Sequence, residues 1–188
     1  MSDFARLIEV QIPKLRRYAR GLTHDATRAD DLVQDTLCRA LAKEHLYQPD
    51  TNLRAWLFTL MHNQYVNDVR RSARETNVLN VEDVASQLAA TTDPTASRQL
   101  MELDRALGNL PTEQRQVILL VGLEGMRYDE AAVILDIPIG TVRSRLSRGR
   151  YELRLLMGME EERPGRLAPQ VSGERRKRAA PVLEPIAA

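Results

Sequence analysis

The sequence lacks the residues on which several classes of protein depend. It contains one cysteine, Cys38, in 188 residues, which excludes an intrachain disulfide framework and a zinc site built from cysteines. It has no apolar run of membrane-spanning length and no signal-like stretch at its start. We therefore expect a cytoplasmic protein with no membrane contact. Cys38 stands among apolar neighbours, which predicts a buried, inert thiol.

Net charge and catalytic groups are equally scarce. The formal net charge is only +1, so the chain as a whole cannot hold nucleic acid, and any DNA contact must come from local patches. The three histidines, His24, His45 and His62, lie on separate segments without metal-ligand spacing, and no nucleophile–base pair is evident. We expect no catalytic residue, no metal and no cofactor, and therefore no enzyme.

What the sequence does contain is helical periodicity, and the fold class it predicts is all-α. Apolar residues recur at helical spacing in 3–22, where Pro13 predicts a break, and again from residue 28 onward. A loop is expected at 46–52, because that stretch is rich in turn formers, and a long helix at 53–74. Residues 3–74 are thus expected to form a first helical domain.

The following residues, 75–94, have weak periodicity and few apolar side chains. We expect a flexible linker, with one short helix near 82–88, and nothing in it that clamps the flanking parts together. A second small domain is expected at 95–159, including a helix that starts after Leu110-Pro111. Residues 160–188 are too poor in apolar residues for a core, which predicts a disordered tail.

The second domain contains the most informative stretch, 128–156, which reads YDEAAVILDIPIGTVRSRLSRGRYELRLL. Pro138 breaks the helical pattern, and Gly140-Thr141 begins a second helix, whose inner face would carry Val142, Leu146 and Leu153. Its outer face is rich in arginine, opposed within the segment only by Glu152. A solvated basic helix is the alternative interpretation, but two short helices with a basic second one are typical of a DNA-reading helix-turn-helix.

Two other helical faces have polar side chains that allow two interpretations. The acidic residues near position 31 lie toward the start of their helix, where the helix dipole favours carboxylates, so a structural role explains them on spacing alone. Asn63, Gln64 and Asn67 stand beside aromatic residues and arginines, a combination suited to unpaired bases, although the pattern alone is weak.

Three segments, in this order, resemble the bacterial RNA polymerase sigma factors of the extracytoplasmic-function (ECF) group. They are ADDLVQDTLCRAL (29–41), NLRAWLFTLMHNQYVNDVRR (52–71) and LPTEQRQVILLVGLEGMRYDEAAVILDIPIGTVRSRLSRGR (110–150). NLRAWLF and IPIGTVRSRLSRGR are most similar to the general-stress (EcfG-type) sigma factors of alphaproteobacteria. The resemblance implies two domains, sigma region 2 and sigma region 4, joined by the linker.

The resemblance also implies partners and residue roles. It replaces the structural interpretation of the acidic residues, because Asp31, Gln34 and Asp35 match the helix that docks on the β′ clamp helices of core RNA polymerase. The β flap, promoter DNA and an anti-sigma factor are the other implied partners. Opening of the −10 element is assigned to the loop 47–52 and the helix after it, with Asn52, Asn63, Asn67, Arg70 and Arg71. Reading of the −35 element is assigned to Thr141, Arg143, Ser144, Arg145 and Arg148.

Departures and rivals remain. Arg127 stands where many relatives have a serine that caps the next helix, and Gly149 replaces a commoner alanine, at a helix cost of about 1 kcal/mol. A sigma-mimicking partner-switch protein is one rival, but such mimics carry a receiver domain and need no arginine row. A DNA-binding regulator that acts without polymerase is the other, and the DLVQD segment disfavours it. We further expect an inhibitor helix to wedge between the two domains and compete with β′.

Overall fold

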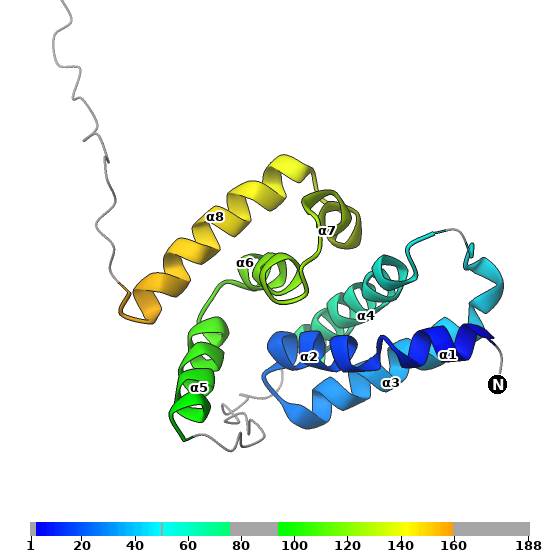
Figure 1. Ribbon diagram of the computed structural model, residues 1–188, viewed down its shortest axis with the longest axis horizontal. Helices are drawn as coiled ribbons and strands as arrows, with labels where there is room; N and C mark the ends of the chain where they lie inside the picture. Colours follow the sequence, from blue (N-terminus) through cyan, green and yellow to red (C-terminus); the bar gives the residue numbers. More distant parts are fainter. Residues whose placement is uncertain (1–2, 50, 76–93, 160–188) are drawn as a thin grey trace, which may run out of the picture.

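The computed structural model describes residues 3–49, 51–75 and 94–159, which form helices joined by short connections (Figure 1). No strand occurs in these ranges, and the expected all-α class is confirmed. The first half contains α1 (Asp3–Glu9), α2 (Ile12–Thr23), α3 (Ala26–Ala42), the 3-10 turn η1 (Glu44–Leu46) and α4 (Leu53–Glu75). The second contains α5 (Pro94–Gly108), α6 (Thr112–Val117), the π-helical segment η2 (Ile118–Leu123), α7 (Tyr128–Leu135) and α8 (Ile139–Leu156).

Helix boundaries in the first half follow local chemistry. The expected break near Pro13 lies between α1 and α2, and the proline occupies the first turn of α2, where its missing N–H costs nothing. Asp25 begins α3, since its carboxylate accepts the backbone N–H of Arg28 at 2.8 Å. Asn52 does the same for α4, accepting the N–H of Ala55 at 3.1 Å. The three helices that enclose the first core are thus started by their own sequence signals.

The first half packs around α2, α3 and α4. Tyr18 is fully buried, and its ring centroid lies 5.1 Å from that of Phe58. A second aromatic group joins the N-terminus to the loop before α4, with Tyr47 5.4 Å from Phe4 and 5.6 Å from Trp56. Tyr47 is therefore a packing residue of that loop.

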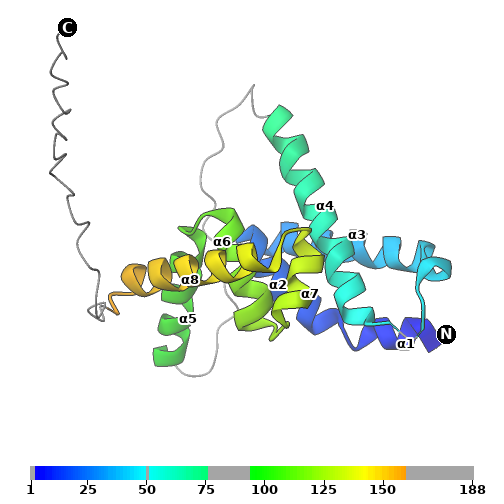
Figure 2. The same ribbon diagram turned by 90° about the horizontal axis from the view of Figure 1, so that it is seen from above.

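In the second half, α6 and η2 run centrally, and α7 and α8 pack on them (Figures 1 and 2). Asp136 ends α7 in the left-handed conformation, with φ of 51°, which a short polar side chain tolerates. Arg127 precedes α7 and its side chain does not cap the helix, as its identity predicts. Glu130 compensates in part, because its carboxylate accepts the Arg127 backbone N–H at 2.8 Å.

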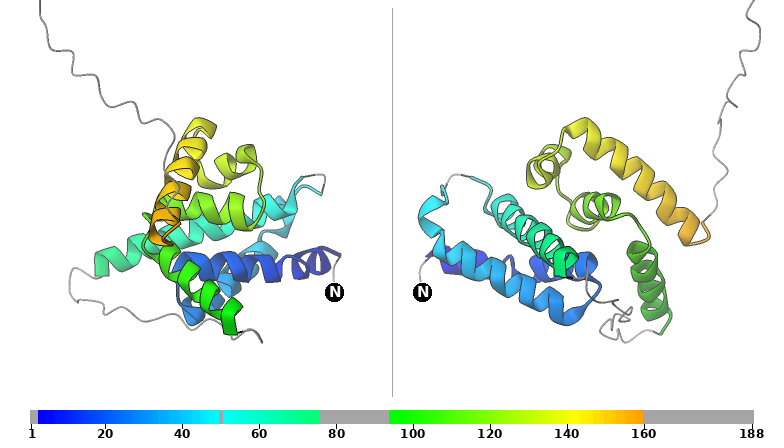
Figure 3. Two further views of the ribbon diagram at one scale, coloured as in Figure 1. Left: turned by 60° about the vertical axis from the view of Figure 1, so that its left-hand side comes forward. Right: turned by 180° about the vertical axis from the view of Figure 1, so that it is seen from behind.

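The two halves pack directly against each other, α2 against η2 and α4 against α7 (Figure 3). Gly21 makes the first contact possible, since a Cβ at this position would lie 2.6 Å from a methyl carbon of Leu119. The sequence alone did not predict this packing. The expected short helix near 82–88, the linker between α4 and α5, and the tail 160–188 lie outside the described residues.

The structure overturns one expectation about a single residue and adds to another. Cys38 is exposed, because the buried face of α3 runs through Leu32, Thr36 and Ala40 and leaves position 38 on the opposite side. Gly149 is more than a weak helix former, because it is buried where α8 crosses α6. A Cβ at this position would lie 2.8 Å from Ile118 Cδ1 and 3.1 Å from Gln114 Cβ.

None of the helices in the described ranges combines the length and apolar character that a membrane crossing demands.

The close approach at Gly149 predicts an unusual response to alanine. Glycine to alanine in an open helix gains about 1 kcal/mol, but Gly149→Ala should lower the free energy of unfolding, by about 1–3 kcal/mol, because the core is overpacked. Urea unfolding measures it. Gly140→Ala is the matched control, since it lies in the same helix with nothing within 4 Å of its Cβ.

Ile118→Val removes the methyl group nearest to the new Cβ, so Gly149→Ala should cost less in that background. Equal stabilisation by Gly149→Ala and Gly140→Ala would show that α8 does not pack this closely on α6.

Candidate nucleic-acid interface and docking groove

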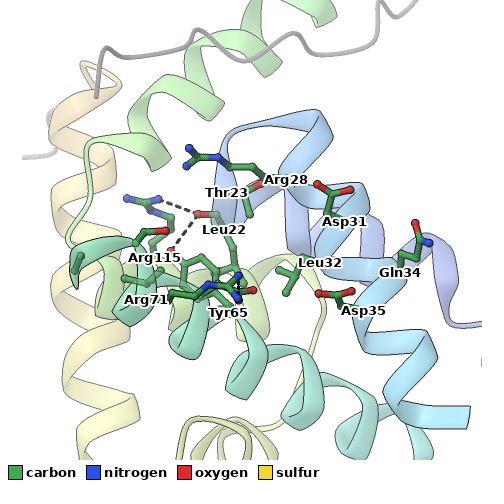
Figure 4. A pocket seen from close by; sticks show the side chains of 14 residues that line it. Leu22, Thr23, Arg28, Asp31, Leu32, Gln34, Asp35, Tyr65, Arg71 and Arg115 are labelled. Atoms are coloured by element: carbon green, nitrogen blue, oxygen red, sulfur yellow. Dashed lines mark hydrogen bonds and ion pairs between the residues drawn. The ribbon is translucent and has the colours of Figure 1, made fainter. Parts of the chain in front are cut away.

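The acidic residues of α3 form one edge of a groove. Asp31, Gln34 and Asp35 are all exposed, since they occupy the helix positions that the core does not use. The groove between α3 and α4 has a volume of about 970 Å³, and Tyr65 and Val69 of α4 line its other side. Figure 4 shows the three α3 residues along the rim, with Tyr65 and Arg71 across from them.

Arg115, from α6, closes one end of the groove. Its guanidinium donates to the backbone carbonyl of Leu22 at 3.3 Å (Figure 4). It also donates to the backbone carbonyls of Gly108 and Leu110, both at 3.0 Å. Burial lowers the pKa of Arg115 from its ordinary value, with nearby Tyr65 opposing the shift. The groove therefore has an acidic edge and an arginine at one end, and it is lined by both halves of the chain.

His24 lies at the same junction. Its Nδ1 is 3.2 Å from Asp104 Oδ1 of α5, and burial lowers the pKa of the imidazole, with the positive charge of Arg115 adding to the effect. The sequence indicated no role for this residue, and the structure gives it a place in the contact between the halves.

The residues assigned to the −10 element lie along α4. Asn63, Asn67 and Arg70 are exposed and follow one another at helical spacing, so they share one face. Arg71 lies about 100° around the helix from Arg70. It turns toward the groove between α3 and α4, where its guanidinium is 3.3 Å from the Asp68 carboxylate. The structure thus brings Asn63, Asn67 and Arg70 together on one face of α4, and Arg71 lies at the edge of that face, four residues after Asn67, where it also lines the groove.

Asn52 stands apart from these at the start of α4. Besides capping the helix, its side-chain Nδ2 donates to Glu130 of α7 at 2.7 Å. The side chain that sequence resemblance places in a base-binding loop is thus engaged with the other half of the chain.

The residues assigned to the −35 element all lie on α8. Val142, Leu146 and Gly149 face the core, which leaves Arg143 and Arg148 exposed. The remaining assigned residues, Thr141, Ser144 and Arg145, are half-buried. Ser144 donates its hydroxyl to the Thr141 carbonyl at 3.0 Å, and the Arg148 side chain folds back to Ser144 at 3.4 Å.

A second arginine group on α8 combines Arg143, which was assigned to the −35 element, with Arg150 and Arg154, which were not. Arg143, Arg150 and Arg154 line a hollow of about 310 Å³ with Tyr128 and Ser147. Their positions are seven and four residues apart, so a common side of the helix could have been inferred from spacing. Three guanidinium groups around one hollow suit a phosphate oxygen better than a base edge.

Among the described residues, no three His, Cys, Asp or Glu side chains come together in a way that could hold a metal ion.

Comparison with known proteins decides the family. The chain is 42% identical over 150 residues to the ECF RNA polymerase sigma factor EcfG of Rhodopseudomonas palustris, a match that covers 78% of this chain and 80% of EcfG. It belongs to the ECF sigma factors. These are transcription initiation factors, not enzymes.

Family models match both halves of this sigma factor. Residues 8–62 match the sigma-2 domain of PhyR, and residues 100–153 match region 4 of sigma-70. The first match covers α2, α3 and the start of α4, and the second covers the helix-turn-helix. The α3 edge of the groove and the arginine-bearing helix α8 therefore lie in matched parts of the chain, whereas Tyr65 and Val69 on the α4 side lie between the two matches.

Solved structures agree with this assignment. The structure of RpoE with the anti-sigma factor NepR from Bartonella quintana has a TM-score of 0.77 and 34% identity, covering 86% of this chain and all of that one. That of CnrH with the cytosolic domain of CnrY has a TM-score of 0.63 and 28% identity, covering 84% of this chain and 89% of that one. The fold of this sigma factor thus resembles that of relatives bound to other proteins.

Proposed function

We propose that this sigma factor directs core RNA polymerase to promoters through four contacts, two with polymerase and two with DNA. Residues 3–74 serve as the region 2 domain, and residues 95–159 serve as the region 4 domain. The α3 edge of the groove docks on the β′ clamp helices, while the region 4 domain contacts the β flap. The exposed face of α4 opens the −10 element, and α8 reads the −35 element.

The observation that carries this proposal is the division of labour on α8. Its buried face anchors the helix to α6 and η2, and its opposite side presents arginines in an otherwise nearly neutral protein. Guanidinium groups suit the O6 and N7 atoms of guanine, and they suit phosphate oxygens. A helix fixed on one side and basic on the other fits the major groove.

The α4 face supports the −10 assignment in a different way. Asn63 and Asn67 offer amide donors and acceptors, and Arg70 adds a charge, all exposed to solvent. Extruding a base from duplex DNA costs a few kcal/mol, which stacking and hydrogen bonds on such a face can offset. Transcription in vitro, with core polymerase and a promoter library, tests the whole proposal. A sigma-mimicking protein or a polymerase-independent regulator would support no transcription in this assay.

Two arginines of α8 should respond differently to alanine. Arg148→Ala should weaken −35 binding by about 1–3 kcal/mol and relax the preference at one position, because it would remove a base contact. Arg150→Ala should weaken binding on all sequences alike and lower the salt dependence, because it would remove a phosphate contact. Binding titrations on −35 duplex variants at several salt concentrations measure both.

The contrast makes each variant the control for the other. If Arg148→Ala weakened all sequences uniformly, Arg148 would be a phosphate contact. If neither changed binding, α8 would not be the DNA-reading helix.

The docking edge predicts a loss of polymerase binding without a loss of structure. Asp31→Ala combined with Gln34→Ala should sharply weaken binding to core polymerase, since both side chains project from the rim. Asp30→Ala is the matched control, because Asp30 is exposed on the same helix but does not line the groove. Helical content from circular dichroism should be unchanged in both. Normal transcription by the double variant would place the docking face elsewhere.

The comparisons also support a regulated role. RpoE was solved with the anti-sigma factor NepR, and CnrH with the cytosolic domain of CnrY. We infer that this sigma factor is held by an anti-sigma protein that binds the groove. Its similarity to EcfG supports a role in a general stress response.

Occlusion of the groove makes the anti-sigma protein and core polymerase mutually exclusive. With the sigma factor and its inhibitor held fixed, added core polymerase should displace the inhibitor, and fluorescence anisotropy of labelled inhibitor follows the release. A ternary complex formed without loss of affinity would rule out occlusion.

A further inference from the structure

Glu124 is a buried carboxylate shared by the two halves of the chain. Its side chain has no exposed surface, and it follows η2 in the second half. Arg17 of α2 makes a fork, with Nε 2.8 Å from Oε1 and Nη2 3.1 Å from Oε2. Arg54 of α4 donates to Oε2 at 3.0 Å and also to the Glu124 backbone carbonyl. Both arginines belong to the first half, so separating the halves would return this carboxylate to water.

Arg54 is held in place on its own side of the contact. Arg54 lies over the Phe58 ring, with its guanidinium carbon 5.6 Å from the centroid. The hydrogen bonds that Arg17 donates to Glu124 raise the pKa of Arg17 from its ordinary value. The contact thus joins two guanidinium groups to one carboxylate, and a charge-assisted fork is among the stronger hydrogen-bonding arrangements in proteins.

A second polar contact covers the start of α4. The Asn52 side chain donates to Glu130 at 2.7 Å, and α7 packs alongside α4 (Figure 1). Asn52 is one of the side chains proposed to act at the −10 element. With the halves in contact, that end of α4 faces α7.

The −35 helix remains accessible in the same arrangement. Arg143 and Arg148 are exposed on α8, away from the contact. The packed form thus leaves one DNA-binding surface open while it covers an end of the other.

We propose that Glu124 is the latch of a closed, self-inhibited form of the free sigma factor, held by Arg17 and Arg54, in which α7 covers the start of α4. Charged groups suit a latch, because water can solvate both partners once they separate, while the packing of Leu119 against Gly21 adds an apolar part to the same contact. The latch itself stands without the proposed function, but its effect on transcription rests on that function.

Fluorescence energy transfer in the full-length chain tests the latch without polymerase or DNA. Cys38 is exposed and accepts one dye, and Glu152→Cys on the exposed side of α8 accepts the other. Glu124→Gln should shift the closed-to-open equilibrium roughly tenfold toward the open form, as expected for losing charged hydrogen bonds. Glu113→Gln makes the same charge change at an exposed position of α6 and should shift nothing.

Arg17→Gln provides a second route to the same opening, because its side chain is 52% exposed and its loss should spare the core. The double variant with Glu124→Gln should open less than the sum of the two single variants, since both act through one contact. Circular dichroism confirms that each variant is folded. An unchanged transfer distribution in both single variants would overturn the latch.

The inhibitory effect is measured as the amount of factor that gives half-maximal transcription. Glu124→Gln should lower that amount and leave binding to an isolated −35 duplex unchanged. If the variant opens yet needs as much factor as the wild type, the contact does not inhibit, and the proposal is wrong on this point. Failure of the proposed function would instead appear as no transcription by the wild type.

Discussion

A carboxylate without exposed surface must be hydrogen-bonded, and the way Glu124 meets this requirement sets the arrangement of the whole chain. Removing one partner of a buried ion pair destabilises a protein by at least about 3 kcal/mol, because the remaining charge is left buried and unpaired. Among the described residues, the arginines that bond Glu124 are Arg17 and Arg54 of the first half, so α2 and α4 must come close to it. Gly21 then allows the helices to approach until Leu119 packs on α2. The ion pair and the apolar contact thus depend on the same geometry.

Much of the fold follows from local signals in the sequence. Pro13, Asp25 and Asn52 mark helix starts that depend only on neighbouring residues, and each lies where the structure begins a helix. The exposure of Arg143 and Arg148 follows from helical spacing alone, because the apolar positions of α8 determine its inner face. Interactions within one turn of helix are thus readable from sequence.

Contacts between distant segments could not be predicted in this way. Arg17 and Glu124 are 107 residues apart, and nothing in either neighbourhood distinguishes them from exposed charges. From the sequence alone, Gly149 is only a weak helix former. The packing reason for a glycine at this position is the Ile118 side chain, which lies on another helical segment. The exposure of Cys38 is not predicted by its apolar neighbours in sequence, because those neighbours occupy different faces of α3. For the DNA- and polymerase-contacting residues, the family resemblance supplied roles that spacing alone left open.

The π-helical segment η2 ties the position of Glu124 to the length of the chain. The Glu124 N–H donates to the carbonyl of Leu119, five residues back, at 2.9 Å, so this turn holds one residue more than an α-helical turn. A chain one residue shorter here could close the turn as an ordinary α-helix and would rotate Glu124 by about 100°. Its carboxylate would then point away from both arginines, although every side chain of the contact was still present. Among homologous chains, a single-residue deletion in this turn would therefore release the two halves as effectively as a substitution of the glutamate.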